Sequence, residues 1–96
     1  MKVYYVYILK CSDKTYYTGI TSNIEQRLLE HTKGLKKGSY TYFRRPIELV
    51  FYCEFTEAEM AISKEKQIKK WSKVKKEALI NNEYETLPNL AKKKFD

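Results

Sequence analysis

The pattern of hydrophobic and polar positions distinguishes segments predicted to be strands from segments with helical spacing. Residues 3–10 are almost all β-branched, aromatic or aliphatic, which is typical of a strand covered on both faces. Polar residues 12–14 supply a turn, and residues 15–20 are predicted to form a second strand, so the chain opens with a β-hairpin. Gly19 permits a bulge or a close approach to the backbone. Residues 47–55 are predicted to form a third strand.

The first helix is predicted over about residues 23–33. Ser22 and Glu25 have the spacing of a capping box, and Gly34 stands at the position of a C-terminal cap. A single apolar stripe at helical spacing joins Ile24, Leu28 and, beyond the end of the helix, Leu35. We therefore expect an amphipathic helix that packs on the sheet.

Two further helices are predicted after the third strand. Thr56 and Glu59 form a second capping box, which opens a helix that runs to about Trp71. Trp71 is expected to anchor the last helix on the core. Ser72 is a cap for a shorter helix that ends near Asn81.

The order of these segments is β-β-α-β-α-α, which predicts an α+β fold with a three-stranded antiparallel sheet flanked by helices. The 96 residues fit one domain whose core needs neither disulfides nor a structural metal. We place this domain at residues 1–82 and a basic C-terminal tail at residues 83–96. The basic, aromatic segment 36–46 is predicted to be a loop or a short turn of helix.

Charge and cysteine content restrict the possible partners and compartment. Lysine and arginine outnumber the acids 19 to 12, for a formal charge of +7, which favours a polyanion and above all nucleic acid. Solubility or anionic lipid are the alternatives. Cys11 and Cys53 have no metal-binding spacing and are predicted to be reduced core thiols. The apolar run at residues 3–9 is too short to span a membrane, so we expect a cytoplasmic protein that has no membrane partner.

One combination of residues carries candidate chemistry. Its members lie in the two hairpin strands, on the first helix and on the helix after the third strand: Tyr5-Val6-Tyr7, Tyr17-Thr18-Gly19, Arg27, His31 and Glu65. In order and spacing this pattern resembles the GIY-YIG nuclease family, and specifically its small stand-alone branch. The sequence departs from the family at Tyr5, where a glycine is usual. The resemblance implies a metal-dependent endonuclease that hydrolyses phosphodiester bonds of nucleic acid, with DNA as the expected substrate.

The resemblance also implies a catalytic role for each residue. Tyr17 would be the general base, and Tyr7 would orient the water or the phosphate. Arg27 and His31 would stabilise phosphate charge, for which a guanidinium fork and an imidazole are suited. Glu65 would hold a single divalent metal, Mg²⁺ or Mn²⁺, with water and phosphate as the other ligands. A phenol ordinarily holds its proton, so the base requires nearby cations, and Lys10 is a possible helper across the hairpin.

The same residues can be interpreted without the family. Arg27 and His31 lie one helical turn apart, so both can reach over the sheet. Glu65 falls on the core-facing side of its helix, where an ionised carboxylate requires a metal, or else a buried lysine or tyrosine hydroxyl. Tyr7 and Tyr17 share a face of the sheet only if the hairpin has an odd-length loop or a bulge. The structure can test each of these conditions.

Further nucleic-acid contacts are predicted from basic and aromatic residues. The segment 40–46 interleaves arginines with aromatic rings, a composition that can stack on bases and clamp phosphates, although a packed loop is an equal alternative. The seven lysines between Lys64 and Lys76 are most simply a solvated helical face that steers a polyanion weakly. The contact residues that we predict are Lys10, Tyr42, Arg44, Arg45 and Lys69.

Taken singly, these residues have ordinary structural explanations. Tyr7 alone would be a core aromatic residue, His31 a satisfied histidine and Arg27 a surface ion-pair partner. Only their combination favours a site. Two other functions stay open. The first is a nucleic-acid-binding module that has no turnover or that needs a protein partner for specificity. The second is a protein-interaction adaptor. The adaptor requires an exposed apolar patch, which the sequence does not indicate.

Overall fold

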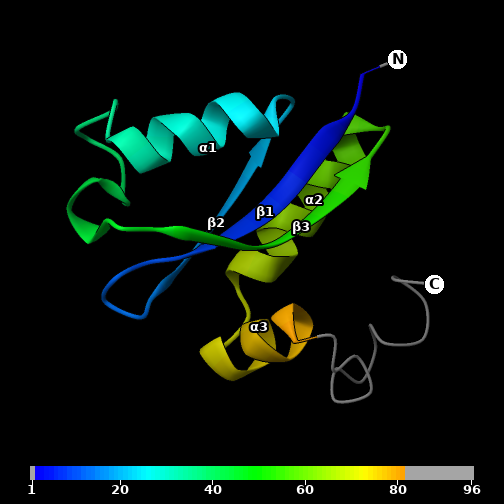
Figure 1. Cartoon of the computed structure of the whole chain (residues 1–96). Helices are drawn as coiled ribbons and strands as arrows, with labels where there is room; N and C mark the ends of the chain where they lie inside the picture. Colours follow the sequence, from blue (N-terminus) through cyan, green and yellow to red (C-terminus); the bar gives the residue numbers. More distant parts are fainter. Residues whose placement is uncertain (1, 82–96) are drawn as a thin grey trace.

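A computed structural model describes residues 2–81, which form one three-stranded sheet and three α-helices (Figure 1). In chain order the elements are β1 (Tyr4–Lys10), β2 (Tyr16–Thr21), α1 (Ile24–Lys33), the 3₁₀ turn η1 (Tyr42–Arg44), β3 (Glu48–Phe55), α2 (Ala58–Lys69) and α3 (Lys73–Ile80). The predicted α+β class and the order β-β-α-β-α-α are confirmed. The tail predicted at residues 83–96 lies outside the described residues.

The sheet is antiparallel with the order β2-β1-β3, so the N-terminal strand is central and β2 is an edge strand. Tyr7 lies opposite Gly19, and Leu9 lies opposite Tyr17. Residues 11–15, an odd number, connect the two hairpin strands. Tyr7 and Tyr17 therefore share one face of the sheet, which is the condition that the candidate site required.

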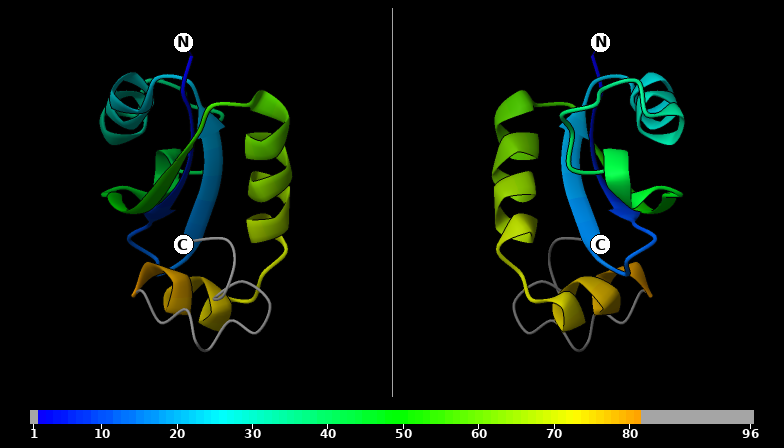
Figure 2. Two further views of the ribbon diagram at one scale, coloured as in Figure 1. Left: turned by 90° about the vertical axis from the view of Figure 1, so that its right-hand side faces the viewer. Right: turned by 90° about the vertical axis from the view of Figure 1, so that its left-hand side faces the viewer.

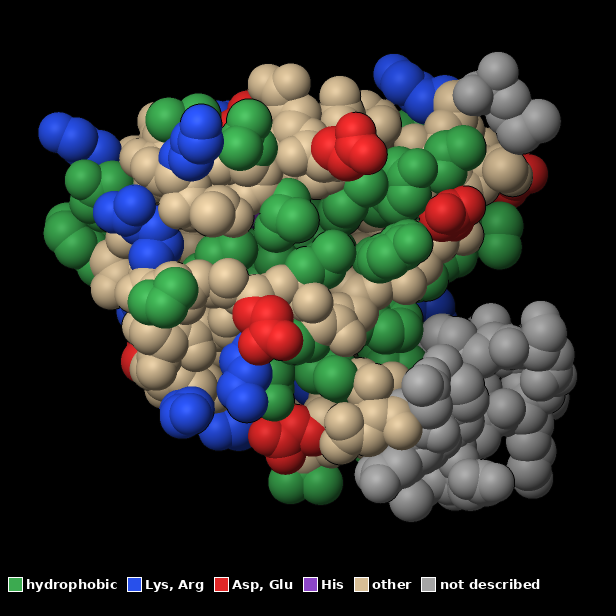
Figure 3. All heavy atoms as spheres, in the orientation of Figure 1, with side chains coloured by type: hydrophobic (Ala, Val, Ile, Leu, Met, Phe, Trp, Pro, Cys, Tyr) green, Lys and Arg blue, Asp and Glu red, His purple; other side chains and the backbone are tan. Residues whose placement is uncertain are grey.

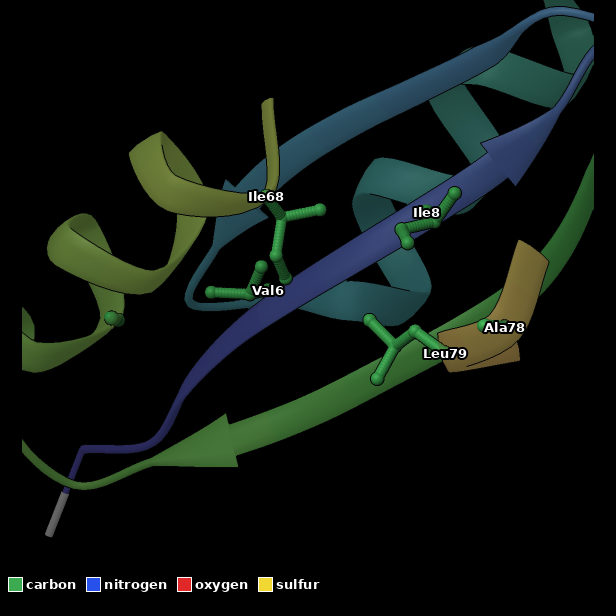
Figure 4. Packing of buried hydrophobic residues seen from close by; sticks show 6 residues of the cluster. Val6, Ile8, Ile68, Ala78 and Leu79 are labelled. Carbon is green, nitrogen blue, oxygen red and sulfur yellow. The ribbon is translucent and has the colours of Figure 1, made fainter. Parts of the chain in front are cut away.

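The helices cover both faces of the sheet. Val6 and Ile8 are fully buried against α2 and α3, and Figure 4 shows them packed beside Ile68, Ala78 and Leu79. Burial of each large aliphatic side chain stabilises the fold by about 1.5–3 kcal/mol. Figure 2 shows α1 on the opposite side of the sheet from α2. The odd-numbered positions of β1, which include the buried Tyr7 and Leu9, therefore face α1, and the cluster that contains Val6 and Ile8 lies on the other face.

The first helix begins at Ile24, one residue later than predicted, and its cap is also shifted by one residue. Asn23, not Ser22, caps α1, and its side chain accepts a hydrogen bond of 3.1 Å from the backbone N–H of Gln26. Asparagine binds the orphan N–H groups as serine does, so the sequence pattern could not separate the two residues. Gly34 adopts the left-handed conformation at the C-cap (φ 66°), as predicted. Leu35 is 62% exposed, so the predicted third member of the apolar stripe is wrong.

The second predicted capping box is also wrong. Glu57 occupies the N-cap of α2 and makes no side-chain cap hydrogen bond. Ser72 does cap α3, where its hydroxyl accepts from the N–H of Lys75 at 3.2 Å. Trp71 packs against the core, as expected. Lys64 is buried and donates to Gln67 Oε1 at 3.0 Å, so the lysines of α2 are not a purely solvated face.

Other predictions concern the thiols and the surface. Cys11 and Cys53 are free thiols. None of the helices within residues 2–81 has the length and apolar character needed to cross a membrane. Figure 3 shows hydrophobic side chains gathered in a band across the face that α1 and β3 present, and Leu29 and Tyr52 are about half exposed. The structure therefore has an exposed apolar surface that the sequence did not indicate.

Candidate active site

A buried chain of hydrogen bonds joins β1, α1 and the segment before η1. The hydroxyl of Tyr7 lies 3.1 Å from His31 Nε2. The other ring nitrogen, Nδ1, lies 2.7 Å from the hydroxyl oxygen of Thr41, which lies 3.3 Å from that of Ser39. Tyr7 is 1% exposed, His31 7% and Thr41 0%. Both nitrogens of His31 therefore have protein partners.

Gly19 makes room for the side chain of Tyr7. A Cβ atom at position 19 would lie 2.5 Å from Tyr7 Cζ, which is impossible without displacement. Because Gly19 lies opposite Tyr7 in the ladder, the tyrosine ring can cross β2 and reach α1. The close approach that the sequence indicated at this glycine is confirmed, and it serves the site directly.

Tyr17 lies within a stack of rings beside this chain of hydrogen bonds. Its ring centroid is 5.3 Å from that of His31 and 6.3 Å from that of Tyr7. On the other side, Tyr40 stacks on Tyr17 at 5.8 Å with an interplanar angle of 25°. The guanidinium of Arg44 covers the ring of Tyr40 at 3.9 Å. The two candidate phenols are thus close together, on one face and held from several sides.

A small cavity of about 130 Å³ opens beside Tyr17. Its lining combines aromatic, cationic and acidic side chains with one hydroxyl: Tyr17, Arg27, Glu30, His31, Lys36 and Ser39. Glu30 Oε1 lies 3.2 Å from Arg27 Nε and 3.7 Å from Lys36 Nζ. The cavity therefore holds two cationic groups around one carboxylate.

Burial shifts the pKa values of Tyr7 and His31 away from those of exposed side chains. Desolvation raises the pKa of Tyr7 to about 12, the negative charge of an ionised Tyr17 adds to this, and Arg27 opposes it through its charge and by hydrogen bonding. Desolvation lowers the pKa of His31, and the charge of Arg27 lowers it further. At neutral pH Tyr7 therefore keeps its proton and His31 is neutral.

Glu65 does not line this cavity. It is 9% exposed on the sheet-facing side of α2, across the sheet from α1, and its carboxylate accepts a 2.7 Å hydrogen bond from Lys69. The hydrogen bond to Glu65 raises the pKa of Lys69, and Tyr17 acts in the same direction, so Lys69 lies within electrostatic reach of both.

The other predicted contact residues are dispersed around the site. Lys10 lines a separate hollow near the hairpin turn, away from Tyr17. Arg44 is engaged by Tyr40 and by Asp13, with Nε 3.2 Å from Asp13 Oδ2. Arg45 donates to the carbonyl of Tyr42 at 2.9 Å and lies over its ring. Both arginines therefore have partners within the segment 40–46, while Phe43 is 87% exposed.

Five residues of this arrangement were not among the predicted site residues. They are Glu30, Lys36, Ser39, Tyr40 and Thr41. Glu30 has a local signal, because it precedes His31 and follows Arg27 by one helical turn. The other four come from the irregular segment after α1, where spacing carries no information about direction.

Comparisons with known proteins match the chain to one family. Residues 3–78 match the family described as the GIY-YIG catalytic domain. The chain is 47% identical over 83 residues to a UPF0213 protein of Syntrophus aciditrophicus, covering 86% of this chain and 95% of that protein. It is 40% identical over 81 residues to a UPF0213 protein of Staphylococcus saprophyticus, covering 84% and 98%.

Solved structures resemble the chain over a similar length. The solution structure of the UPF0213 protein BH0048 of Bacillus halodurans has a TM-score of 0.55 and 40% identity, and the match covers 82% of this chain and 83% of that one. The solution structure of protein EF2693 of E. faecalis has a TM-score of 0.60 and 32% identity, with coverage of 85% and 86%.

Proposed function

The chain belongs to the GIY-YIG family, and on this premise we propose that it is a divalent-metal-dependent endonuclease that hydrolyses phosphodiester bonds of nucleic acid, with DNA as the substrate. The cavity beside Tyr17 is the observation that carries the proposal. It joins a phenol, a guanidinium and an ammonium in a space that accommodates a phosphate group. The net charge of +7 favours such a polyanion.

The two tyrosines take different roles. Tyr7 is buried, holds its proton and contacts His31, so it supports the site from beneath rather than meeting water. Tyr17 borders the cavity, and no residue within 2–81 hydrogen-bonds its hydroxyl. We therefore assign the general base to Tyr17, and Lys69 is a cation within electrostatic reach of it.

Arg27 and Lys36 bind the phosphate in this proposal. Arg27 presents planar donors to the cavity and can form paired hydrogen bonds with two phosphate oxygens, which also stabilises the charge that develops during attack. His31 has both nitrogens occupied, so its role is to orient Tyr7 rather than to protonate a leaving oxygen.

Glu65 is the residue that would hold the metal. Within residues 2–81, no group of three or more histidine, cysteine, aspartate or glutamate side chains could hold a metal together. A single carboxylate that is shielded from solvent and paired with a half-exposed lysine nevertheless fits Mg²⁺ or Mn²⁺, which retain water and accept phosphate oxygens as ligands. Such an ion would supply charge stabilisation to a phosphate that reaches Glu65 as well as the cavity.

Cleavage of supercoiled plasmid in Mg²⁺ or Mn²⁺ tests the proposal. We expect Tyr17→Phe and Glu65→Gln each to reduce cleavage by roughly 100-fold. The matched controls are Tyr52→Phe on β3 and Glu59→Gln on α2, both exposed and away from the cavity, and these should cleave normally. Unchanged cleavage in Tyr17→Phe or Glu65→Gln would remove the assigned mechanism.

One observation favours a second candidate, a nucleic-acid-binding module without turnover. Glu65 already has a cationic partner and does not line the cavity, so the carboxylate and the phosphate site are not yet joined. A screen across duplex, flap, junction and single-stranded substrates separates the two. Salt-sensitive binding without metal-dependent products on any substrate supports the module.

A further inference from the structure

We propose that Thr41 is a positioning residue of this site: its hydroxyl accepts a hydrogen bond from His31 Nδ1–H, and this selects the tautomer in which His31 Nε2 accepts the proton of Tyr7. The inference rests on the proposed function for its catalytic consequence. The tautomer itself does not depend on that function.

The directions are set by the buried hydroxyl of Tyr7, whose hydrogen-bond partner within residues 2–81 is His31 Nε2. The phenolic proton of Tyr7 then needs an acceptor of its own, because the residue is 1% exposed. His31 Nε2, at 3.1 Å, is the acceptor in reach.

This choice determines the rest of the chain. A neutral imidazole carries one proton, so Nδ1 carries it when Nε2 accepts. Nδ1 lies 2.7 Å from Thr41 Oγ1, and Thr41 is fully buried, so the threonine hydroxyl accepts and can pass its own proton toward Ser39 at 3.3 Å. Every donor from Tyr7 to Thr41 then points the same way, an arrangement in which each bond polarises and strengthens the next.

The opposite assignment leaves a proton without a partner. If Nε2 donated to Tyr7, the phenolic proton would be buried with no acceptor, which is unfavourable. Thr41 thus acts through His31 on the direction in which the Tyr7 hydroxyl donates. Because the segment 39–41 contributes both Thr41 and the stacked Tyr40, this loop orients the site from two sides.

Nuclear magnetic resonance of the imidazole nitrogens tests the inference, and the chain contains one histidine, so assignment is unambiguous. We expect a pyrrole-type signal for Nδ1 and a pyridine-type signal for Nε2 in the wild-type protein at neutral pH. Thr41→Ser should keep this pattern. Thr41→Val, which keeps the shape and loses the hydroxyl, should introduce the Nε2–H tautomer.

Activity provides the second readout. We expect Thr41→Val to lower plasmid cleavage by about tenfold to a hundredfold, as misplaced catalytic groups do. Thr41→Ser should restore it, and Thr32→Val, an exposed change on α1, should not affect it. Binding of a duplex without metal should stay within about twofold in all three variants.

Two outcomes overturn the inference. A wild-type spectrum with Nε2 protonated removes the tautomer, whether or not the protein cleaves nucleic acid and whether or not Thr41→Val folds. A Thr41→Val protein with the wild-type spectrum and wild-type cleavage removes the role of Thr41. Absence of cleavage in every protein refutes the proposed function instead, and the spectra still decide the tautomer.

Discussion

Gly19 lies directly opposite Tyr7 in the β1–β2 ladder, and the ring of Tyr7 occupies the space where a Cβ at position 19 would stand. Because Gly19 has no side chain, Tyr7 of the central strand can extend across β2 and reach His31 on α1. A change at this glycine should therefore affect the site through Tyr7.

Gly19→Ala is expected to destabilise the fold by about 1–3 kcal/mol, the usual effect of overpacking a buried contact. Urea unfolding measures this. Gly38→Ala is the control, because a Cβ at Gly38 meets no atom within 4 Å, and its effect should stay within about 0.5 kcal/mol. Equal stability of the two variants would contradict the proposed contact between Tyr7 and Gly19.

Glu30→Gln should strengthen binding of nucleic acid. The carboxylate of Glu30 pairs with Arg27 and Lys36, so it competes with a phosphate for both cations. Removing its charge should lower the Kd for a duplex by about two- to fivefold, measured without divalent metal at fixed salt. Glu25→Gln, an exposed change on the same helix, reports the effect of net charge alone. If both variants bind equally well, Glu30 has no specific role.

Lys69→Gln should lower the metal concentration needed for half-maximal cleavage. The ammonium of Lys69 lies 2.7 Å from Glu65 and occupies the carboxylate that the metal would use. Because the lysine is half exposed, the expected shift is at most about fivefold. Lys66→Gln removes the same charge from an exposed position of α2. A half-saturation point that moves equally in both variants, or in neither, would argue against Glu65 as the metal ligand.

Stability should fall as the pH decreases below the ordinary pKa of histidine. Burial lowers the pKa of His31 from 6.5 in the folded protein, so the unfolded chain binds a proton more readily. The contribution of neutral His31 is fully present above pH 6.5 and is lost as the pH falls from there toward the folded pKa. The free energy of unfolding, measured at intervals from about pH 7 to pH 5, tests this.

His31→Gln is the matched variant for this measurement, because glutamine does not titrate. Its stability should depend less steeply on pH in the same range, whatever its absolute value. Parallel curves for the two proteins would assign the pH dependence to carboxylates instead.

Local patterns in the sequence determined the secondary structure. Strand alternation is a property of neighbouring residues, so the three strands and the hairpin followed from spacing. The shared face of Tyr7 and Tyr17 did not, because it depends on the connection 11–15, which is one residue longer than the predicted strand bounds allow. Gly34 and Ser72 act on the backbone within one turn, so these caps were also predictable. Asn23 displaced Ser22 because adjacent polar residues offer equivalent caps.

The content of the site depended on tertiary structure. Thr41 and Tyr40 lie in an irregular segment whose direction no period describes, and they meet His31 and Tyr17 only because the chain folds back over the sheet. Spacing placed Glu65 on the buried side of its helix, but it could not show that α2 covers the opposite face from α1. Sequence alone thus determined which residue types were available on each element. Packing of both faces of one sheet decided which of them share a cavity, since that depends on contacts between residues far apart in the chain.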